Sequence, residues 1–168
     1  MQRLTKPVLA FLSVMIAVSI ARADDGLSFK DSPAQQVLAV KVDGPNGYAA
    51  AFGTLVGYYL KRNIPVSFPQ MSIETGGGSF AAIAFTGNAA EDGGIIVLAV
   101  PAAKVATSTH KGPYADLSQA ISRTMAAAQQ RGCIPDMARS LRLLHPNSPD
   151  NTAAPDLITE IQIPVTGC

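Results

Sequence analysis

Tryptophan is absent from this sequence, and aromatic residues make up only 6% of its 168 positions. A cage of several aromatic rings around a cationic ligand would therefore have few members. Charged residues are also scarce, at 15%, and no cluster of basic residues exceeds the pair Lys61-Arg62. We expect no nucleic-acid partner, because DNA and RNA binding requires a dense basic surface.

The sequence has no hydrophobic run long enough to cross a bilayer. Its longest run, Val8 to Ala21, spans about 21 Å as a helix, whereas a hydrocarbon core measures roughly 30 Å. Two basic residues precede this run, and Ala21-Arg22-Ala23 places small residues where a signal peptidase reads them. We therefore predict a signal peptide over residues 1–23, cleaved before Asp24, and a periplasmic or secreted protein. A membrane anchor is the competing interpretation, and no stable membrane insertion is expected after cleavage.

The net charge that remains after the predicted cleavage is slightly negative. Arg3, Lys6 and Arg22 all precede Asp24, so ten basic residues remain against twelve acidic ones, a net charge of about −2. This balance gives no attraction to a polyanion. The remaining 145 residues are enough for one domain with a core of its own.

Cysteine occurs only twice, at Cys133 and Cys168. An even number of cysteines in an exported protein favours a disulfide, which here would attach the C-terminal tail to the domain. The alternative is a half-buried free thiol at Cys133 and an oxidisable thiol at Cys168.

Histidine is equally rare, and His110 and His145 lack the paired spacing of zinc ligands. The glycine-rich stretch from Gly76 to Ser79 is not followed by the Gly-Lys-Ser/Thr of a phosphate loop, so it predicts a hairpin turn. We therefore expect neither a bound metal nor a cofactor.

The segment from Lys104 to Met125 predicts the unit around which the chain is organised. Its first half alternates β-branched residues with others, which favours a half-buried strand. Gly112-Pro113 ends this strand, because proline sets a backbone angle suited to the first helical turn. An apolar stripe at three-and-four spacing then predicts an amphipathic helix, with Leu117, Ile121, Met125 and Ala128 on one face.

The same order of elements occurs in the first half of the chain. A strand from Gln35 ends at Gly44-Pro45, and a helix from about Gly47 to Arg62 follows it. Asp24 to Ala34, which precedes this unit and contains a proline, predicts a flexible leader. Two strand candidates follow each helix, at 68–75 and 80–86 in the first half and at 140–144 and 157–165 in the second. A continuous apolar run at 95–100 predicts a central strand buried on both faces.

Two dipeptides recur at nearly one offset along the chain. The Gly-Pro pairs at 44 and 112 lie 68 positions apart, and the Ile-Pro pairs at 64 and 134 lie 70 apart. We interpret this as an internal duplication, with coincidence as the alternative. The predicted fold is α+β, in which two pseudo-symmetric β-α-β-β repeats form an antiparallel sheet with both helices on one side. It follows the signal peptide (1–23) and the leader (24–34), and it occupies residues 35–168.

Two motifs of the second half carry a resemblance to a known family. The run Thr107-Ser-Thr-His-Lys-Gly-Pro-Tyr-Ala-Asp-Leu and the later run Leu157-Ile-Thr-Glu-Ile-Gln-Ile-Pro-Val resemble the GyrI-like small-molecule-binding domain. This domain is also the effector-binding module of AraC-type and MerR-type regulators. The resemblance extends from about Val37 to Val165, and it implies two pseudo-symmetric halves that enclose a groove for hydrophobic, often cationic, compounds. The sequence departs from the family in the strand at 141–145, which has no tyrosine.

In this family the glutamate of the last strand is the principal residue of the site, and the resemblance matches it to Glu160. The alternation of the last strand singles out the same side chain, since Ile158, Glu160 and Gln162 share one face, which lies toward either solvent or a cavity. In a partly desolvated groove, a carboxylate favours a cationic ligand. The further candidates for ligand contacts are aromatic or apolar residues that core packing explains equally well: Tyr48, Phe68, Met71 and Tyr114.

Three functions are compatible with these features. The first is a periplasmic small-molecule-binding protein, anchored by Glu160 and without catalytic residues. The second is a hydrolase of reactive small molecules, in which the same glutamate activates water and Tyr114 orients it. The third is a protein-interaction or inhibitor module with an empty groove. The expected partner is a small amphipathic molecule, and the sequence identifies no protein partner.

Overall fold

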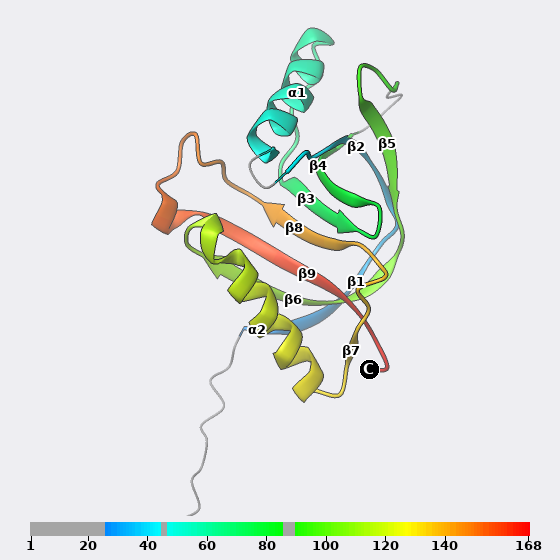
Figure 1. The fold of residues 1–168 in the computed structure, drawn as a ribbon, viewed down its shortest axis with the longest axis vertical. Coiled ribbons are helices and arrows are strands. Elements are labelled where there is room, and N and C mark those ends of the chain that lie inside the picture. The colour runs from blue at the N-terminus through cyan, green and yellow to red at the C-terminus, as the bar shows by residue number, and fades with distance from the viewer. Residues whose placement is uncertain (1–25, 45–46, 86–89) are drawn as a thin grey trace, which may run out of the picture.

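The computed structural model describes residues 26–44, 47–85 and 90–168. The predicted signal peptide and its cleavage site lie outside these ranges. Within them the chain forms an α+β fold of nine strands and two α-helices (Figure 1). Neither helix is long and apolar enough to cross a membrane. In chain order the elements are β1 (Ser28–Ser32), β2 (Gln35–Lys41), α1 (Tyr48–Lys61), β3 (Gln70–Thr75), β4 (Gly78–Ala84), β5 (Ile95–Val100), β6 (Ala103–Lys111), a 3-10 turn (Tyr114–Asp116), α2 (Leu117–Gln130), β7 (Ile134–Pro135), β8 (Leu141–His145), a second 3-10 turn (Ala154–Asp156) and β9 (Ile158–Thr166).

The strands form an antiparallel sheet in the order β1-β6-β9-β8-β3-β4-β2-β5, and β7 adds a short pair with β9. The repeats β2-α1-β3-β4 and β6-α2-β8-β9 meet at the central pair of β3 and β8. The register of this pair places Gln70 opposite His145 and Glu74 opposite Leu141. The predicted arrangement of two β-α-β-β repeats is therefore confirmed.

Both helices lie on the same face of the sheet, as predicted. α1 packs on Leu38 and Ile83, whereas α2 packs on Leu143 and Ile161. In the ladders, Leu38 lies opposite Ile83, and Leu143 lies opposite Ile161. Gln70 connects the two pairs, because it lies opposite both Ile83 and His145, and His145 is two positions from Leu143. Residues that lie opposite each other or two positions apart share a face, so all of these side chains point to one side of the sheet. α2 follows Gly112-Pro113, and each helix presents its apolar stripe to its own half of the sheet.

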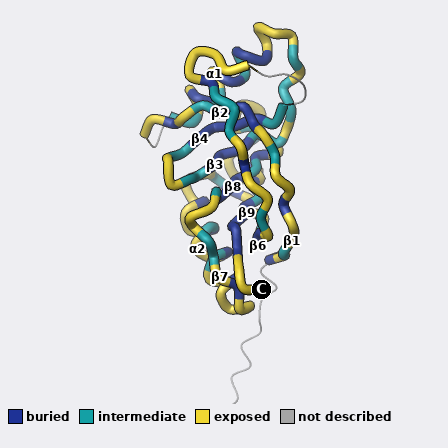
Figure 2. Tube along the Cα trace, turned by 90° about the vertical axis from the view of Figure 1, so that its right-hand side faces the viewer, coloured by how far each residue is buried: buried dark blue, intermediate teal, exposed yellow. Residues whose placement is uncertain are grey.

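The face away from the helices is buried as well. Val37, Ala39 and Ile73 point to this face and are fully buried, although neither helix covers it. The sheet coils because β1 leads directly into β2 and β5 into β6, which joins the two ends of the strand order (Figure 1). Buried positions accordingly follow β3, β8 and β9 through the middle of the molecule (Figure 2).

Two elements differ from the sequence-based expectation. The segment expected to be a flexible leader contains β1, which pairs with β6 along Ser28–Ser32. The apolar run at 95–100, expected to be central, forms β5 at the end of the strand order. Its two faces are both apolar because Ile95 packs toward α1 while Ile96 packs into the core on the opposite face.

The predicted pairing of Cys133 with Cys168 is confirmed. This disulfide joins the end of α2 to the C-terminal end of β9 across 35 positions of sequence. The same tail is also held by β7 and by the Lys104 ammonium, which donates to the Cys168 carbonyl at 2.8 Å.

Arg142 on β8 is a buried charge on the face away from the helices, opposite Ile73 and Gln162 in the ladders. Its side chain is 1% exposed. Among the described residues, its Nε and Nη1 atoms have no hydrogen-bond partner. Burial lowers the pKa of this guanidinium, because the charged form loses its hydration. The folded state therefore carries the desolvation cost of a cation that none of its described acids offsets.

Replacement of this arginine by an apolar residue of similar volume, Arg142→Met, is expected to raise the free energy of unfolding by about 1–3 kcal/mol, since the buried charge is removed without a cavity. Urea denaturation measures the effect. Arg139→Met is the control, because Arg139 is half-exposed and paired with Asp136, so its loss should cost less than about 1 kcal/mol. A loss of stability in Arg142→Met would contradict the prediction.

Candidate functional site

A groove lies over the central strands β3 and β8, between the N-terminal ends of the two helices. It exists because α1 packs mainly on β2 and β4 while α2 packs mainly on β6 and β9, which leaves the helix-facing positions of β3 and the end of β8 at His145 between the two helices. Its volume is about 430 Å³. It is lined by Tyr48, Ala49, Phe52, Gln70, Ser72, Glu74, Tyr114, Leu117, Leu143, His145 and Pro149.

The floor of the groove is polar on β3 because of strand alternation. Gln70, Ser72 and Glu74 point to the helix side, whereas Met71 and Ile73 point into the core on the opposite face. A polar row on a central strand beneath two helices costs burial energy unless a neighbouring group or a ligand satisfies it. The groove leaves these polar side chains accessible to a ligand.

Four rings form a row across the groove. Tyr48 and Phe52 of α1 stack with ring centroids 6.3 Å apart, and Phe52 meets His145 edge-on at 6.4 Å. On the other side, Tyr114 lies 5.1 Å from His145. One tyrosine therefore comes from the helix start of each repeat. Together the rings offer an apolar surface with polar tips.

Glu74 supplies a negative charge at one end of the row. Its carboxylate accepts hydrogen bonds from the Tyr48 hydroxyl and the Ser79 hydroxyl. No lysine, arginine or histidine of the described chain pairs with it. Burial raises the pKa of Tyr48, and the neighbouring Glu74 charge raises it further, so Tyr48 stays a neutral donor.

His145 supplies an uncharged imidazole toward the other end of the row, between Phe52 and Tyr114. Its Nε2 atom lies 2.9 Å from the Ser72 hydroxyl, and its Nδ1 atom lies 3.3 Å from the Thr159 hydroxyl. Burial lowers the pKa of His145 to about 4, because the charged ring would lose its hydration. Near neutral pH this side chain is therefore uncharged, and it has one nitrogen that donates a hydrogen bond and one that accepts. Burial also raises the pKa of the adjacent Tyr114, with a further contribution from the Asp150 charge.

The structure brings only two of the predicted ligand contacts, Tyr48 and Tyr114, into this groove. It places Glu160 on the opposite face of the sheet, where Lys30 and the Gln162 amide donate to its carboxylate. The reason is the register of β9, which directs Ile161 toward α2 and so directs its neighbours away from it.

The remaining predicted contacts also lie outside the groove. Met71 belongs to the core on the opposite face, where it accepts a weak hydrogen bond from Gln35. Phe68 is 57% exposed, and Ile158 is 37% exposed. None of these three side chains lines the groove.

Sequence reasoning did not single out Phe52, Ser72, Glu74 or His145 as ligand contacts. One signal was present, since the polar positions 70, 72 and 74 alternate with the apolar positions 71 and 73 in a strand that the repeats place at the centre. The pairing of His145 with Ser72 had no such signal, because 73 positions separate the two residues. In the described part of the chain, no three His, Cys, Asp or Glu side chains gather as metal ligands would.

Comparison with known proteins places this groove in context. The family model of the GyrI-like small molecule binding domain matches residues 67–166. The C-terminal domain of EcmrR superposes with a TM-score of 0.72 at 20% identity, covering 84% of this chain and 98% of that chain. A hydrolase encoded by lin2189 from Listeria innocua gives a TM-score of 0.66 at 12% identity, over 84% and 92% of the two chains.

A third similar structure is SAV2435 bound to tetraphenylphosphonium, with a TM-score of 0.52 at 14% identity over 84% of this chain and 94% of that one. No curated protein matches the sequence. At these identities the structural similarities establish a common fold. The family model covers well over half of the sequence, including both motifs of the second half. The chain therefore belongs to the family of GyrI-like small-molecule-binding domains.

Proposed function

We propose that this protein binds amphipathic small molecules that carry a positive charge, and that Glu74 is the residue that attracts the charge. The observation that carries the proposal is a carboxylate without a described counter-cation at the end of a row of aromatic rings. A cation bound there would offset the cost of holding Glu74 in a partly desolvated groove. The sequence-based expectation of a cationic ligand is kept, but its anchor moves from Glu160 to Glu74.

The shape of the groove restricts the ligand further. The backbone positions of Glu74 and His145 lie at opposite ends of the central strand pair, about 13 Å apart along the strand direction, and the His145 ring reaches back toward Ser72. A ligand that uses both ends has its cationic group near Glu74 and an aromatic or apolar body along Phe52 toward His145. The groove volume of about 430 Å³ suits a molecule of moderate size.

The test uses two probes that differ in charge and little in shape, methyltriphenylphosphonium and triphenylphosphine oxide. The cation is expected to stabilise the protein, and the neutral oxide is expected to have a much smaller effect. At a hundred times its dissociation constant a ligand adds about 2.7 kcal/mol of stability, which thermal denaturation detects easily. The related structure that holds tetraphenylphosphonium supports the choice of a phosphonium probe.

Glu74→Gln is expected to weaken phosphonium binding about 10- to 100-fold, because it removes the charge and keeps the oxygen that accepts from Tyr48. Isothermal titration calorimetry measures the change. Glu160→Gln is the matched control, since it makes the same substitution outside the groove and should leave affinity unchanged. Equal binding of both probes, or a loss in Glu160→Gln alone, would contradict the role of Glu74.

Hydrolysis has weaker support from the same geometry. The proposed glutamate of that mechanism, Glu160, lies on the other face of the sheet. Ser72 and His145 are within hydrogen-bond distance, but a histidine whose pKa falls to about 4 is a weak base. The hydroxyl of Thr159 lies beside the His145 Nδ1 atom, where a catalytic triad has a carboxylate. A hydroxyl does not stabilise an imidazolium as a carboxylate does. Binding without turnover is therefore the function we propose.

We also propose that the protein is exported and acts in the periplasm. The charged, apolar and small-residue segments of positions 1–23 support a cleaved signal peptide. The disulfide between Cys133 and Cys168 supports an oxidising compartment. N-terminal sequencing of protein recovered from the periplasmic fraction should read Asp24 first, and recovery only from the cytoplasm would contradict export.

A further inference from the structure

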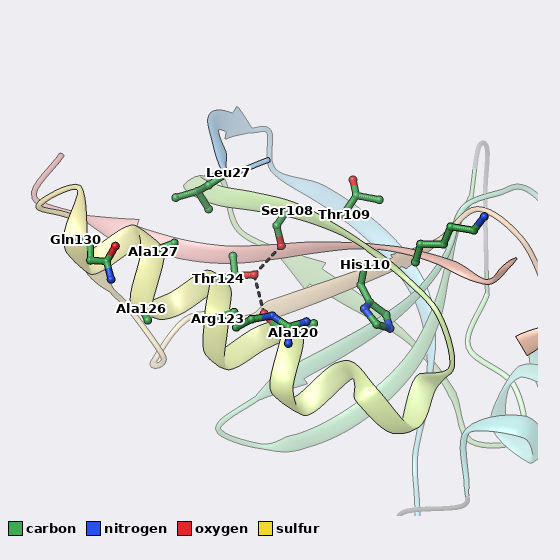
Figure 3. A pocket seen from close by; sticks show the side chains of 11 residues that line it. Leu27, Ser108, Thr109, His110, Ala120, Arg123, Thr124, Ala126, Ala127 and Gln130 are labelled. Atoms are coloured by element: carbon green, nitrogen blue, oxygen red, sulfur yellow. Dashed lines mark hydrogen bonds between the residues drawn. The ribbon is translucent and has the colours of Figure 1, made fainter. Parts of the chain in front are cut away.

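A second cleft lies on the outer side of α2, away from the groove. It has a volume of about 460 Å³ and runs between α2 and the last residues of β6 (Figure 3). The helix side includes the small residues Ala120 and Ala127, which leave space above the strand, and the longer side chains of Arg123 and Gln130. Ser108 and Thr124 bridge its floor with a hydrogen bond of 2.6 Å between their hydroxyls.

The strand edge at this cleft is unpaired over the described residues. β1 pairs with β6 only as far as Ser28 opposite Thr107, whereas β6 continues to Lys111. The Gly112 N–H donates to the Leu157 carbonyl at 2.9 Å, on the β9 side. Because peptide groups alternate in direction along a strand, the N–H and C=O groups of Thr109 and Lys111 point to the opposite, open edge. An exposed edge of this kind is a template for an added strand.

The charged side chains that line the cleft, within the described part of the chain, are both basic. Lys111 and Arg123 line it together with the His110 ring and with hydroxyl and amide side chains, and none of the described lining residues is acidic. Lys111 also pairs with Asp156 at 2.9 Å, but both of these side chains are 64% exposed, so the pair is weak. The same basic residues on a second copy of the chain would repel them, which disfavours edge-to-edge pairing of two copies.

We propose that this cleft binds an extended peptide segment with acidic side chains, which adds as a strand to the free edge of β6 at residues 108–111. The backbone of the peptide satisfies the open N–H and C=O groups of Thr109 and Lys111, and its alternate side chains, which point to the side of α2, place carboxylates near Arg123. This binding site is separate from the small-molecule groove, which lies over β3 and β8.

The experiment uses the purified protein and an acetylated, amidated hexapeptide, Val-Glu-Thr-Glu-Val-Thr. Hydrogen exchange followed by NMR is expected to show the amides of Thr109 and Lys111 slowing about tenfold or more when the peptide is added. The amide of His110 should change little, because it points toward β9. Absence of binding, or binding that leaves the amides of Thr109 and Lys111 exchanging freely, would overturn the proposal. Slow exchange at both amides before any peptide is added would also overturn it, since the edge would then be covered already.

Two altered peptides and two protein variants separate strand addition from general charge attraction. The peptide with Gln in place of both Glu residues should bind more weakly, and a version with N-methylated backbone amides should not bind. Arg123→Gln should weaken binding about threefold. Lys61→Gln should leave binding unchanged, because it removes one positive charge from an exposed position on α1 that lies outside the cleft. Equal losses in these two variants would indicate a non-specific electrostatic effect and overturn the site.

Discussion

Removal of the Cys133–Cys168 disulfide is expected to lower the free energy of unfolding by about 4 kcal/mol. The crosslink closes a loop of 35 positions, and the chain-entropy estimate for a loop of this length is close to that value. The loop contains β7, β8 and β9, and two of these are central strands of the sheet. Without the bond, the unfolded chain has a higher conformational entropy between Cys133 and Cys168, the segment that forms two central strands in the folded state. Guanidinium chloride denaturation of the double variant Cys133→Ala, Cys168→Ala measures the loss.

The wild-type protein in dithiothreitol is the natural control, because it loses the bond and keeps both side chains. Cys133 is 2% exposed, so its replacement by alanine also removes a buried sulfur. The reduced wild-type protein should therefore fall between the oxidised protein and the variant. If oxidised and reduced proteins unfolded at the same denaturant concentration, strand pairing through β7 and the Lys104 contact would be sufficient to hold the tail.

The repeat pattern made most of the fold predictable from sequence. Gly112-Pro113 and the apolar stripe of α2 locate a strand and a helix through local chemistry, and the same signals recur in the first half. β1 was not predictable in this way, since its pairing with β6 joins residues that are far apart in sequence, as many as 79 positions for Ser28 and Thr107. The edge position of β5 was also missed, because a continuous apolar run indicates burial on both faces and does not indicate how many strand neighbours it has.

Which acidic side chain lines the groove was harder to predict. Alternation along β9 correctly separates Glu160 from Ile161, but it cannot tell which of the two faces holds the groove. That choice depends on where the helices pack, and here both lie on the side of Ile161. Glu74 reaches the groove because β3 presents its even positions to the helix side. Its partners, the hydroxyls of Tyr48 and Ser79, come together only through the tertiary structure.

The duplicated architecture explains how one groove acquires two chemically different ends. Each repeat contributes a tyrosine from its helix start, and each contributes a polar residue from its central strand. In the first repeat that residue is the charged Glu74, and in the second it is the neutral His145. A symmetric fold therefore produces a directional groove, with a carboxylate at one end and a neutral hydrogen-bonding imidazole beside Tyr114 toward the other.

The folded protein is expected to lose stability between pH 6.5 and pH 4 because of His145. The pKa of this residue is about 4 in the folded state, below the value near 6.5 expected for an unfolded chain. Above pH 6.5 both states hold the neutral ring, so its contribution does not vary. As the pH falls, the unfolded state takes up the proton first, and the folded state loses about 3 kcal/mol by pH 4. Urea denaturation at half-unit pH steps measures this slope.

His145→Gln should flatten the slope between pH 6.5 and 5, since an amide can bond to Ser72 and Thr159 but does not titrate. Glu160 contributes in a separate and lower range. Burial alone would raise the pKa of Glu160, but the hydrogen bonds from Lys30 and Gln162 lower it overall, so its protonation destabilises the fold only at more acidic pH. The two contributions are therefore separable by pH. An unchanged slope in His145→Gln would mean that the ring is hydrated in the groove, which would also weaken its assignment as the neutral end of the site.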